Sequence, residues 1–150
     1  MWKEVEELEG FFRRFLSLYR PLVTNLNDLL APYQLSYSLW QVLFYLKNEG
    51  PSTLVDISNY YNVEKPTITR RVHRLEELQL VRQIPSKDRR EKITQLTALG
   101  EEIYQTCRKK ITDLENSVME GIAKEEQEVA FHILPKIQHN IRNGEGNKSE

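Results

Sequence analysis

Residues 53–97, TLVDISNYYNVEKPTITRRVHRLEELQLVRQIPSKDRREKITQLT, decide the fold of this chain. The pattern of apolar residues predicts a short helix, a tight turn at Asn62 and a second helix that is rich in arginine. Two short runs of β-type sequence follow, Val81–Pro85 and Lys92–Leu96, and a charged segment, residues 86–91, joins them. Helix, turn, helix and hairpin in this order indicate a winged helix-turn-helix.

The second helix of this stretch has two contrasting faces. Apolar residues at helical spacing are expected to point inward: Ile68, Val72, Leu75 and Leu78. The opposite face and its flanks carry short hydroxyls and long cationic side chains: Pro66, Thr67, Thr69, Arg70, His73 and Arg74. That mixture suits a helix whose first half enters the major groove of duplex DNA. Arg70, central on the outward face, is the candidate for reading a base, and Arg74 is the candidate for contacting a phosphate.

Three positions around this helix need separate interpretation. Arg71 lies nearer the core side, and it either contacts DNA or pairs with Glu77 or with a carboxylate of the hairpin. His73 either touches DNA or is a surface histidine. Glu64, directly before the helix, is a poor capping residue, so a phosphate contact from a cap hydroxyl is not expected there.

The runs EKPTITRRVHRLEELQLV (residues 64–81) and DRREKITQLTALGEE (residues 88–102) resemble the core signature of the MarR-type transcriptional regulators. In that family the first run is the recognition helix, and the second is the wing and the start of a long dimerisation helix. The run LSYSLWQVLFYLKNEGPSTLVDISNYYNV (residues 35–63) extends the resemblance more loosely, and the whole match covers about residues 4–142. The resemblance implies a mainly α fold with a small β-hairpin wing.

The resemblance also implies how the chain is organised. A single MarR-like domain is expected over residues 1–150, with the winged helix-turn-helix at about 36–97. Dimerisation helices are expected at about 2–31 and 98–142, and a disordered tail at 143–150.

The flanking helices carry apolar stripes and three informative prolines. Pro21 and Pro135 are each expected to kink or interrupt the helix that contains them, and Pro32 is expected to end the first helix. The apolar stripes have only each other and a small winged domain to cover them. A second copy of the chain is therefore the natural partner, in a homodimer.

The charged hairpin tip is the second candidate contact with DNA. Asp88 and Arg90 project to the same side of the tip, so the carboxylate can pair with the guanidinium and hold the loop. The family resemblance favours Arg90 as the residue that enters the minor groove, with Arg89 or Lys87 on a phosphate. The alternative is an exposed, solvated turn of charges. The residues expected at DNA are Lys65, Pro66, Thr67, Thr69, Arg70, His73, Arg74, Lys87, Asp88, Arg89 and Arg90.

The distribution of charge agrees with a local contact with phosphates. The chain has a formal net charge of only −1, but between Lys65 and Lys92 nine basic residues face four acidic ones, a net charge of +5. A basic segment between acidic flanks is what binding to a nucleic-acid backbone requires.

Aromatic residues upstream of the helix-turn-helix suggest a binding site for a small molecule. Phe12, Phe15, Tyr19, Tyr37 and Trp40 are the candidates for an effector pocket between the N-terminal helices and the winged domain. For each of these residues taken by itself, packing in the core is an equally good interpretation.

Other chemistry finds little support in the sequence. There is no Ser/His/Asp order, glycine-rich phosphate loop or cysteine cluster of the metal-binding kind, so neither an enzyme nor a cofactor is expected. His132 and His139 are expected to be surface or interface histidines rather than metal ligands. Cys107, the single cysteine, excludes an intramolecular disulfide; a buried inert thiol is the commoner outcome there, and redox sensing is the alternative.

No apolar run approaches the roughly 20 residues that span a bilayer, and no secretory signal is evident, so a soluble cytoplasmic protein is expected. The leading hypothesis is a homodimeric transcriptional regulator on a pseudo-palindromic DNA operator. We expect a repressor whose operator affinity a small-molecule effector lowers. The alternative is a winged-helix protein–protein interaction module whose basic face docks an acidic partner.

Overall fold

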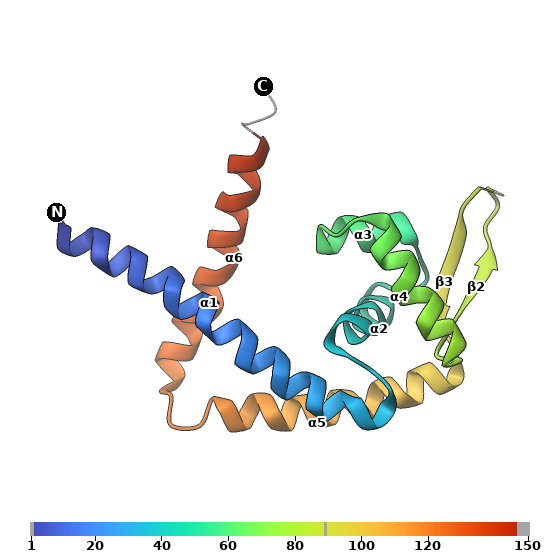
Figure 1. Ribbon diagram of the computed structural model, residues 1–150, viewed down its shortest axis with the longest axis horizontal. Coiled ribbons are helices and arrows are strands. Elements are labelled where there is room, and N and C mark those ends of the chain that lie inside the picture. The colour runs from blue at the N-terminus through green and yellow to red at the C-terminus, as the bar shows by residue number, and fades with distance from the viewer. Residues whose placement is uncertain (1, 89, 147–150) are drawn as a thin grey trace. The chain divides into compact units, whose positions relative to one another are not determined.

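The computed structural model describes residues 2–88 and 90–146 (Figure 1). The elements in chain order are α1 (Trp2–Leu30), the 3-10 helix η1 (Ala31–Tyr33), α2 (Tyr37–Glu49), β1 (Ser52–Thr53), α3 (Leu54–Tyr61), α4 (Lys65–Glu77), β2 (Val81–Pro85), β3 (Lys92–Leu96), α5 (Ala98–Val118) and α6 (Lys124–Gly146). The chain divides into two compact units, Met1–Thr112 and Asp113–Glu150. The predicted fold class, mainly helical with a small β-hairpin wing, is confirmed.

Local side-chain chemistry sets the bounds of the helix-turn-helix. The Thr53 hydroxyl accepts a hydrogen bond from the Asp56 amide at 3.1 Å, and the Thr53 amide donates to the Asp56 carboxylate at 3.2 Å. This capping box starts α3. Asn62 ends it with a φ of 53°, a left-handed conformation that asparagine tolerates better than most residues. At the start of α4 Glu64 makes no side-chain capping bond, as predicted.

The core of the winged domain comes from the inward faces of α2, α3 and α4. The fully buried side chains include Val42, Leu43, Ile57, Ile68, Val72 and Leu75. Three of these are the predicted inward residues of the second helix; the fourth, Leu78, is half-buried. Burial of one such side chain contributes roughly 1.5–3 kcal/mol, so this face holds α4 firmly and leaves its other face in solvent.

The wing is part of a three-stranded antiparallel sheet with the order β1-β3-β2. The hairpin strands β2 and β3 have the predicted bounds and pair from Val81↔Leu96 to Pro85↔Lys92. Strand β1 has only two residues and was not predicted, because so short a run has no recognisable alternation. It pairs with β3 through Ser52↔Thr94 and Thr53↔Ile93, and so attaches the wing to the residue that caps α3.

A second junction joins the wing to α5. The Thr97 hydroxyl donates to the Gln79 carbonyl at 2.7 Å and accepts from the Gly100 amide at 3.0 Å, while the Thr97 amide donates to the Leu80 carbonyl at 3.0 Å. A Cβ added at Gly100 would overlap the backbone oxygen of Leu80 and lie 2.9 Å from its carbonyl carbon. Only glycine therefore allows α5 to approach the exit of α4 this closely.

The prolines of the long helices do not interrupt them. The helix assignment runs through Pro21 in α1 and through Pro135 in α6. Both prolines are exposed, so water can reach the carbonyl four residues earlier that loses its helical donor. The end of α1 just before Pro32 agrees with the prediction.

The predicted start of a disordered tail at Asn143 is wrong for residues 143–146, which continue α6. The Asn143 side-chain amide is 2.9 Å from His139 Nε2, one helical turn earlier, and this contact favours the helix. Residues 147–150 of the expected tail lie outside the described residues. In the described part of the chain no helix is both long and apolar enough to cross a membrane.

The close approach at Gly100 predicts a specific loss of stability. Gly100→Ala forces α5 away from Leu80, and we expect the unfolding free energy to fall by about 1–3 kcal/mol, the usual range for overpacking. Thermal and urea melts measure this loss. Gly10→Ala is the matched control: apart from its chain neighbours and the nearby backbone of its own helix, no described atom lies within 4 Å of a Cβ there, and alanine is the better helix former. Equal stability of the Gly100 variant and the wild type would contradict the prediction.

Two threonines of the wing provide a matched pair of Thr→Val substitutions. Thr94 is fully buried and its hydroxyl has no hydrogen-bond partner among the residues that the structure describes, so we expect Thr94→Val to leave stability unchanged or raise it by about 1 kcal/mol. Thr97→Val removes two hydrogen bonds and should cost about 1–3 kcal/mol. Urea denaturation of both variants measures the difference. An equal change in unfolding free energy for both variants would show that the hydrogen bonds of the Thr97 hydroxyl do not contribute to stability.

Candidate nucleic-acid interface

The face of α4 opposite the core is open to solvent. Lys65, Pro66, Thr69, Arg70, His73 and Arg74 are exposed, and Thr67 is half-buried. The predicted outward set is thus gathered along one helix, beside the wing (Figure 1).

Hydrogen bonds within α4 fix the side chains near its start. Arg70 Nη2 donates to the Thr67 hydroxyl at 3.2 Å, which directs the guanidinium toward the N-terminal half of the helix. The Thr69 hydroxyl donates to the Lys65 carbonyl at 3.0 Å. The Arg70 fork therefore loses less rotamer freedom on contacting a ligand than a free side chain would.

At the end of α4 Glu77 forms ion pairs with two of the residues that were expected to contact DNA. Its carboxylate lies 3.2 Å from Arg74 Nη1 and 3.1 Å from His73 Nε2. Arg74 Nη2 also donates to the Gln34 side chain at 3.4 Å, a contact across 40 positions that no local pattern predicts. Arg74 must exchange the Glu77 carboxylate for a phosphate if it binds DNA.

Arg71 makes neither of the ion pairs proposed for it. Glu77 is occupied by His73 and Arg74, and Arg71 Nη1 is buried with no hydrogen-bond partner among the described residues. Burial raises the pKa of the nearby Tyr61 phenol, whose hydroxyl donates to the Gln41 carbonyl at 2.7 Å, and the positive charge of Arg71 opposes this rise.

The Asp88 carboxylate holds the wing tip, but through the backbone. Its Oδ1 accepts from the Arg90 amide at 3.2 Å, and no ion pair with the guanidinium is found among the described residues. The Asp88 carbonyl accepts from the Ser86 hydroxyl at 2.5 Å and from the Glu91 amide at 3.1 Å. The predicted partner of Asp88 was the Arg90 guanidinium, and the observed partner is the Arg90 amide. In a tight turn the backbone amide two residues later lies closer to the Asp88 carboxylate than the end of the long Arg90 side chain does. Lys87 is exposed, and Arg89 lies outside the described residues.

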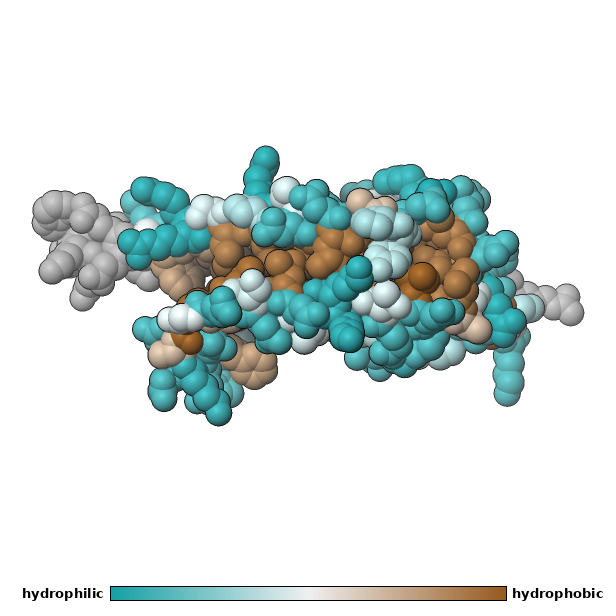
Figure 2. Space-filling view, turned by 90° about the horizontal axis from the view of Figure 1, so that it is seen from below, coloured by the Kyte–Doolittle hydropathy of each residue, from teal (hydrophilic) through white to brown (hydrophobic). Residues whose placement is uncertain are grey.

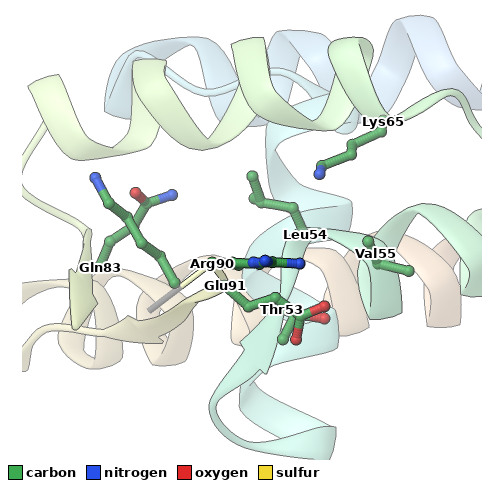
Figure 3. A pocket seen from close by; sticks show the side chains of 8 residues that line it. Thr53, Leu54, Val55, Lys65, Gln83, Arg90 and Glu91 are labelled. Atoms are coloured by element: carbon green, nitrogen blue, oxygen red, sulfur yellow. The ribbon is translucent and has the colours of Figure 1, made fainter. Parts of the chain in front are cut away.

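The Arg90 side chain turns back toward the helices. It lines a pocket of about 210 Å³ together with Thr53, Leu54, Val55, Lys65, Gln83, Glu91 and Lys92. Figure 3 shows the Arg90 guanidinium beside the first turn of α3, and Lys65 reaching into the same space from the start of α4. The sequence did not indicate this grouping, since it depends on how the hairpin folds against α3.

The aromatic residues proposed for an effector pocket have different environments. Phe12, Phe15 and Tyr19 are 47%, 45% and 56% exposed on α1, whereas Trp40 is only 4% exposed. The Trp40 ring stacks on Tyr104 with the ring centres 4.9 Å apart, so core packing describes it best. Tyr37 is half-buried, and its backbone amide donates to the Asn27 side chain at 2.7 Å.

The Cys107 thiol and the possible metal ligands were the other candidates for chemistry. Cys107 is fully buried, and burial raises the pKa of its thiol, which keeps it protonated and unreactive near neutral pH. Within residues 2–88 and 90–146 no group of three or more His, Cys, Asp or Glu side chains could hold a metal ion.

Comparisons with known proteins agree with the fold. The family model for the MarR family matches residues 35–92. The chain is 35% identical over 115 residues to the uncharacterized HTH-type transcriptional regulator YwoH of Bacillus subtilis, covering 77% of this chain and 84% of the relative. It is 27% identical over 132 residues to uncharacterized HTH-type regulators of Staphylococcus aureus, covering 86% of this chain and 90% of theirs.

Solved structures show the same fold. Staphylococcus aureus MarR in complex with salicylate and kanamycin superposes with a TM-score of 0.84 and 26% identity, covering 93% of this chain and 96% of that one. A mutant Escherichia coli MarR complexed with operator DNA superposes with a TM-score of 0.79 and 22% identity, covering 87% and 95%.

The fold and the basic face define a DNA-binding winged helix-turn-helix transcriptional regulator, a class of proteins that are not enzymes. The chain belongs to the MarR family.

Proposed function

We propose that this regulator is a homodimeric repressor that binds a pseudo-palindromic operator through α4 and the wing. The observation that carries the proposal is the outward face of α4, where Thr67 orients Arg70 and the core residues hold the helix from behind. An oriented guanidinium near the start of a recognition helix suits a bidentate contact with guanine. Repression is the simplest consequence, because a dimer that covers an operator excludes other proteins from that DNA. Such a regulator acts on chromosomal DNA, so we also propose a cytoplasmic location.

Exposed apolar side chains support the dimer. On α1 they include Phe11, Leu16 and Leu18, and in the second unit they include Val129, Phe131, Leu134 and Ile141. Phe131 alone is 72% exposed. Figure 2 shows apolar side chains on the surface between hydrophilic margins. Large apolar side chains left open to water on both units indicate an interface with another protein.

The Staphylococcus aureus protein bound to salicylate and kanamycin supports the proposal of an effector. In this chain Phe12, Phe15, Tyr19 and Tyr37 supply aromatic surface that is at least partly open. We propose that a small aromatic ligand binds there and lowers operator affinity. Titration of the DNA complex with salicylate, and separately with kanamycin, tests this directly.

The experiment that tests DNA binding is selection of genomic fragments by the full chain, followed by sequencing of the fragments retained. Enrichment of a pseudo-palindrome with half-sites about 10 base pairs apart is expected, since a two-fold dimer places its recognition helices in successive major grooves. A short asymmetric site would contradict that geometry, and absence of enrichment would contradict DNA binding itself.

The exposed apolar surface predicts the state of the free protein. We expect a dimer at micromolar concentration, because separating the protomers would expose these side chains to water. Sedimentation velocity over a range of concentrations measures the mass. A folded monomer of 17.8 kDa throughout that range would contradict the dimer.

Arg70→Ala is expected to weaken operator binding by roughly 1–3 kcal/mol for each base contact and to relax the preference at one position in each half-site. Titrations against the operator, its single-base variants and unrelated DNA measure both effects. Thermal stability should change little, since Arg70 is exposed. Lys109→Ala, an exposed substitution on α5, is the matched control and should leave the base preference unchanged. An unchanged preference in the Arg70 variant would show that this residue reads no base.

A further inference from the structure

Gln34 has a backbone conformation that glutamine does not favour. It follows η1, in the connection between α1 and α2, with a φ of 59° and a ψ of 25° in the left-handed region. A residue with a Cβ is disfavoured there, whereas glycine is not. The Gln34 side chain is exposed, so it does not offset this cost by packing in the core. Glutamine therefore makes this turn less stable than glycine would.

The side chain of Gln34 makes one hydrogen bond among the residues that the structure describes. Its Oε1 accepts from Arg74 Nη2 at 3.4 Å, while Arg74 Nη1 lies 3.2 Å from Glu77 Oε2. The guanidinium of Arg74 thus has a neutral acceptor on one nitrogen and a carboxylate on the other. A phosphate is repelled by the carboxylate but not by the uncharged amide.

The backbone that carries Gln34 is held firmly. The Gln34 amide donates to the Ala31 carbonyl at 2.9 Å, and the Leu35 amide donates to the Leu30 carbonyl at 3.3 Å. The side chains of Leu30 and Leu35 are both buried. A firmly held acceptor restricts the exposed side chain that donates to it, so Gln34 limits the rotamers of Arg74.

We propose that Gln34 is a positioning residue for operator binding, which holds the Arg74 guanidinium while a backbone phosphate displaces Glu77. This inference rests on the proposed operator binding and adds a residue that precedes the winged helix-turn-helix. Guanidinium has five N–H donors, so Nη2 keeps the Gln34 amide while Nη1 binds the phosphate. Since Gln34 lies in the connection from α1, this hydrogen bond also joins the first helix to the recognition helix in the DNA complex.

The Gln34→Gly substitution tests the proposal, because it should change stability and DNA binding in opposite directions. The midpoint of thermal unfolding should rise, since glycine favours the left-handed turn. Affinity for DNA should fall about three- to tenfold, the usual effect of losing one hydrogen bond of this kind. The base preference should stay the same, because a phosphate contact carries no sequence information. The DNA is the genomic fragment that the full wild-type chain retains most strongly.

Gln79→Gly is the matched control. Gln79 is also an exposed glutamine with a positive φ, 62°, and it lies just after α4. Its side chain makes no hydrogen bond in the described part of the chain, so glycine there should raise the thermal midpoint and leave DNA affinity unchanged. Equal losses of affinity in both glycine variants would overturn the inference, because the backbone change alone would then explain them. A lower thermal midpoint for Gln34→Gly would overturn the premise that the side chain costs stability.

A double-mutant cycle with Arg74→Gln shows whether Gln34 acts through Arg74. Arg74→Gln alone should weaken binding about tenfold and reduce the salt dependence by about one unit of slope per half-site. Gln34→Gly removes no charge, so the salt slope should not change. In the Arg74→Gln background Gln34→Gly should have no further effect on affinity.

The other outcomes of the cycle each overturn the inference. The same loss from Gln34→Gly with and without Arg74 would indicate a direct contact between Gln34 and DNA. Tighter binding by Gln34→Gly would indicate that Gln34 holds Arg74 away from DNA, and unchanged binding would show that it has no part in the complex. Failure of the wild type to bind any DNA would instead overturn the proposed function together with the inference.

Discussion

The contact between Gly100 and the Leu80 carbonyl is the constraint on which the basic face depends. At this point the exit of α4, the last residue of the wing and the start of α5 meet within a few residues. Thr97 bonds to both sides of the junction with its hydroxyl and its amide. The end of α4 and both ends of the hairpin meet at this junction. The distance between the recognition helix and the wing is therefore set by the contacts of the junction and not by side chains on the surface.

Within that frame the charged side chains divide into two groups. Arg70 is oriented by a neutral hydroxyl and keeps its charge available, whereas Arg74 and His73 share the carboxylate of Glu77. Arg70 can bind a ligand without losing an ion pair. Arg74 and His73 must give up their contact with Glu77 before they bind a phosphate. Exposed pairs of this kind contribute only a few tenths of a kcal/mol, so the exchange costs little.

Much of the fold follows from local patterns in the sequence. The hairpin strands and the turn at Asn62 were predicted because each depends on residues close in the chain. The contacts that were missed join distant segments: the pairing of β1 with β3, the bond from Arg74 to Gln34, and the turn of Arg90 into the pocket. The predicted tail was wrong for residues 143–146, where α6 continues and the contact of Asn143 with His139 favours the helix.

The two anchors of the wing also limit how its length can vary. Strand β1 pairs with the middle of β3 and the Thr97 junction holds the base of the hairpin, while the hydrogen bonds of Ser86 and Asp88 stay within the tip. Insertions between Pro85 and Lys92 lengthen the tip and leave its base in place. An insertion between Leu96 and Gly100 displaces every bond of the junction. A change in wing length, or the grafting of a foreign wing onto this scaffold, is therefore expected to be tolerated best at residues 86–91 of the tip.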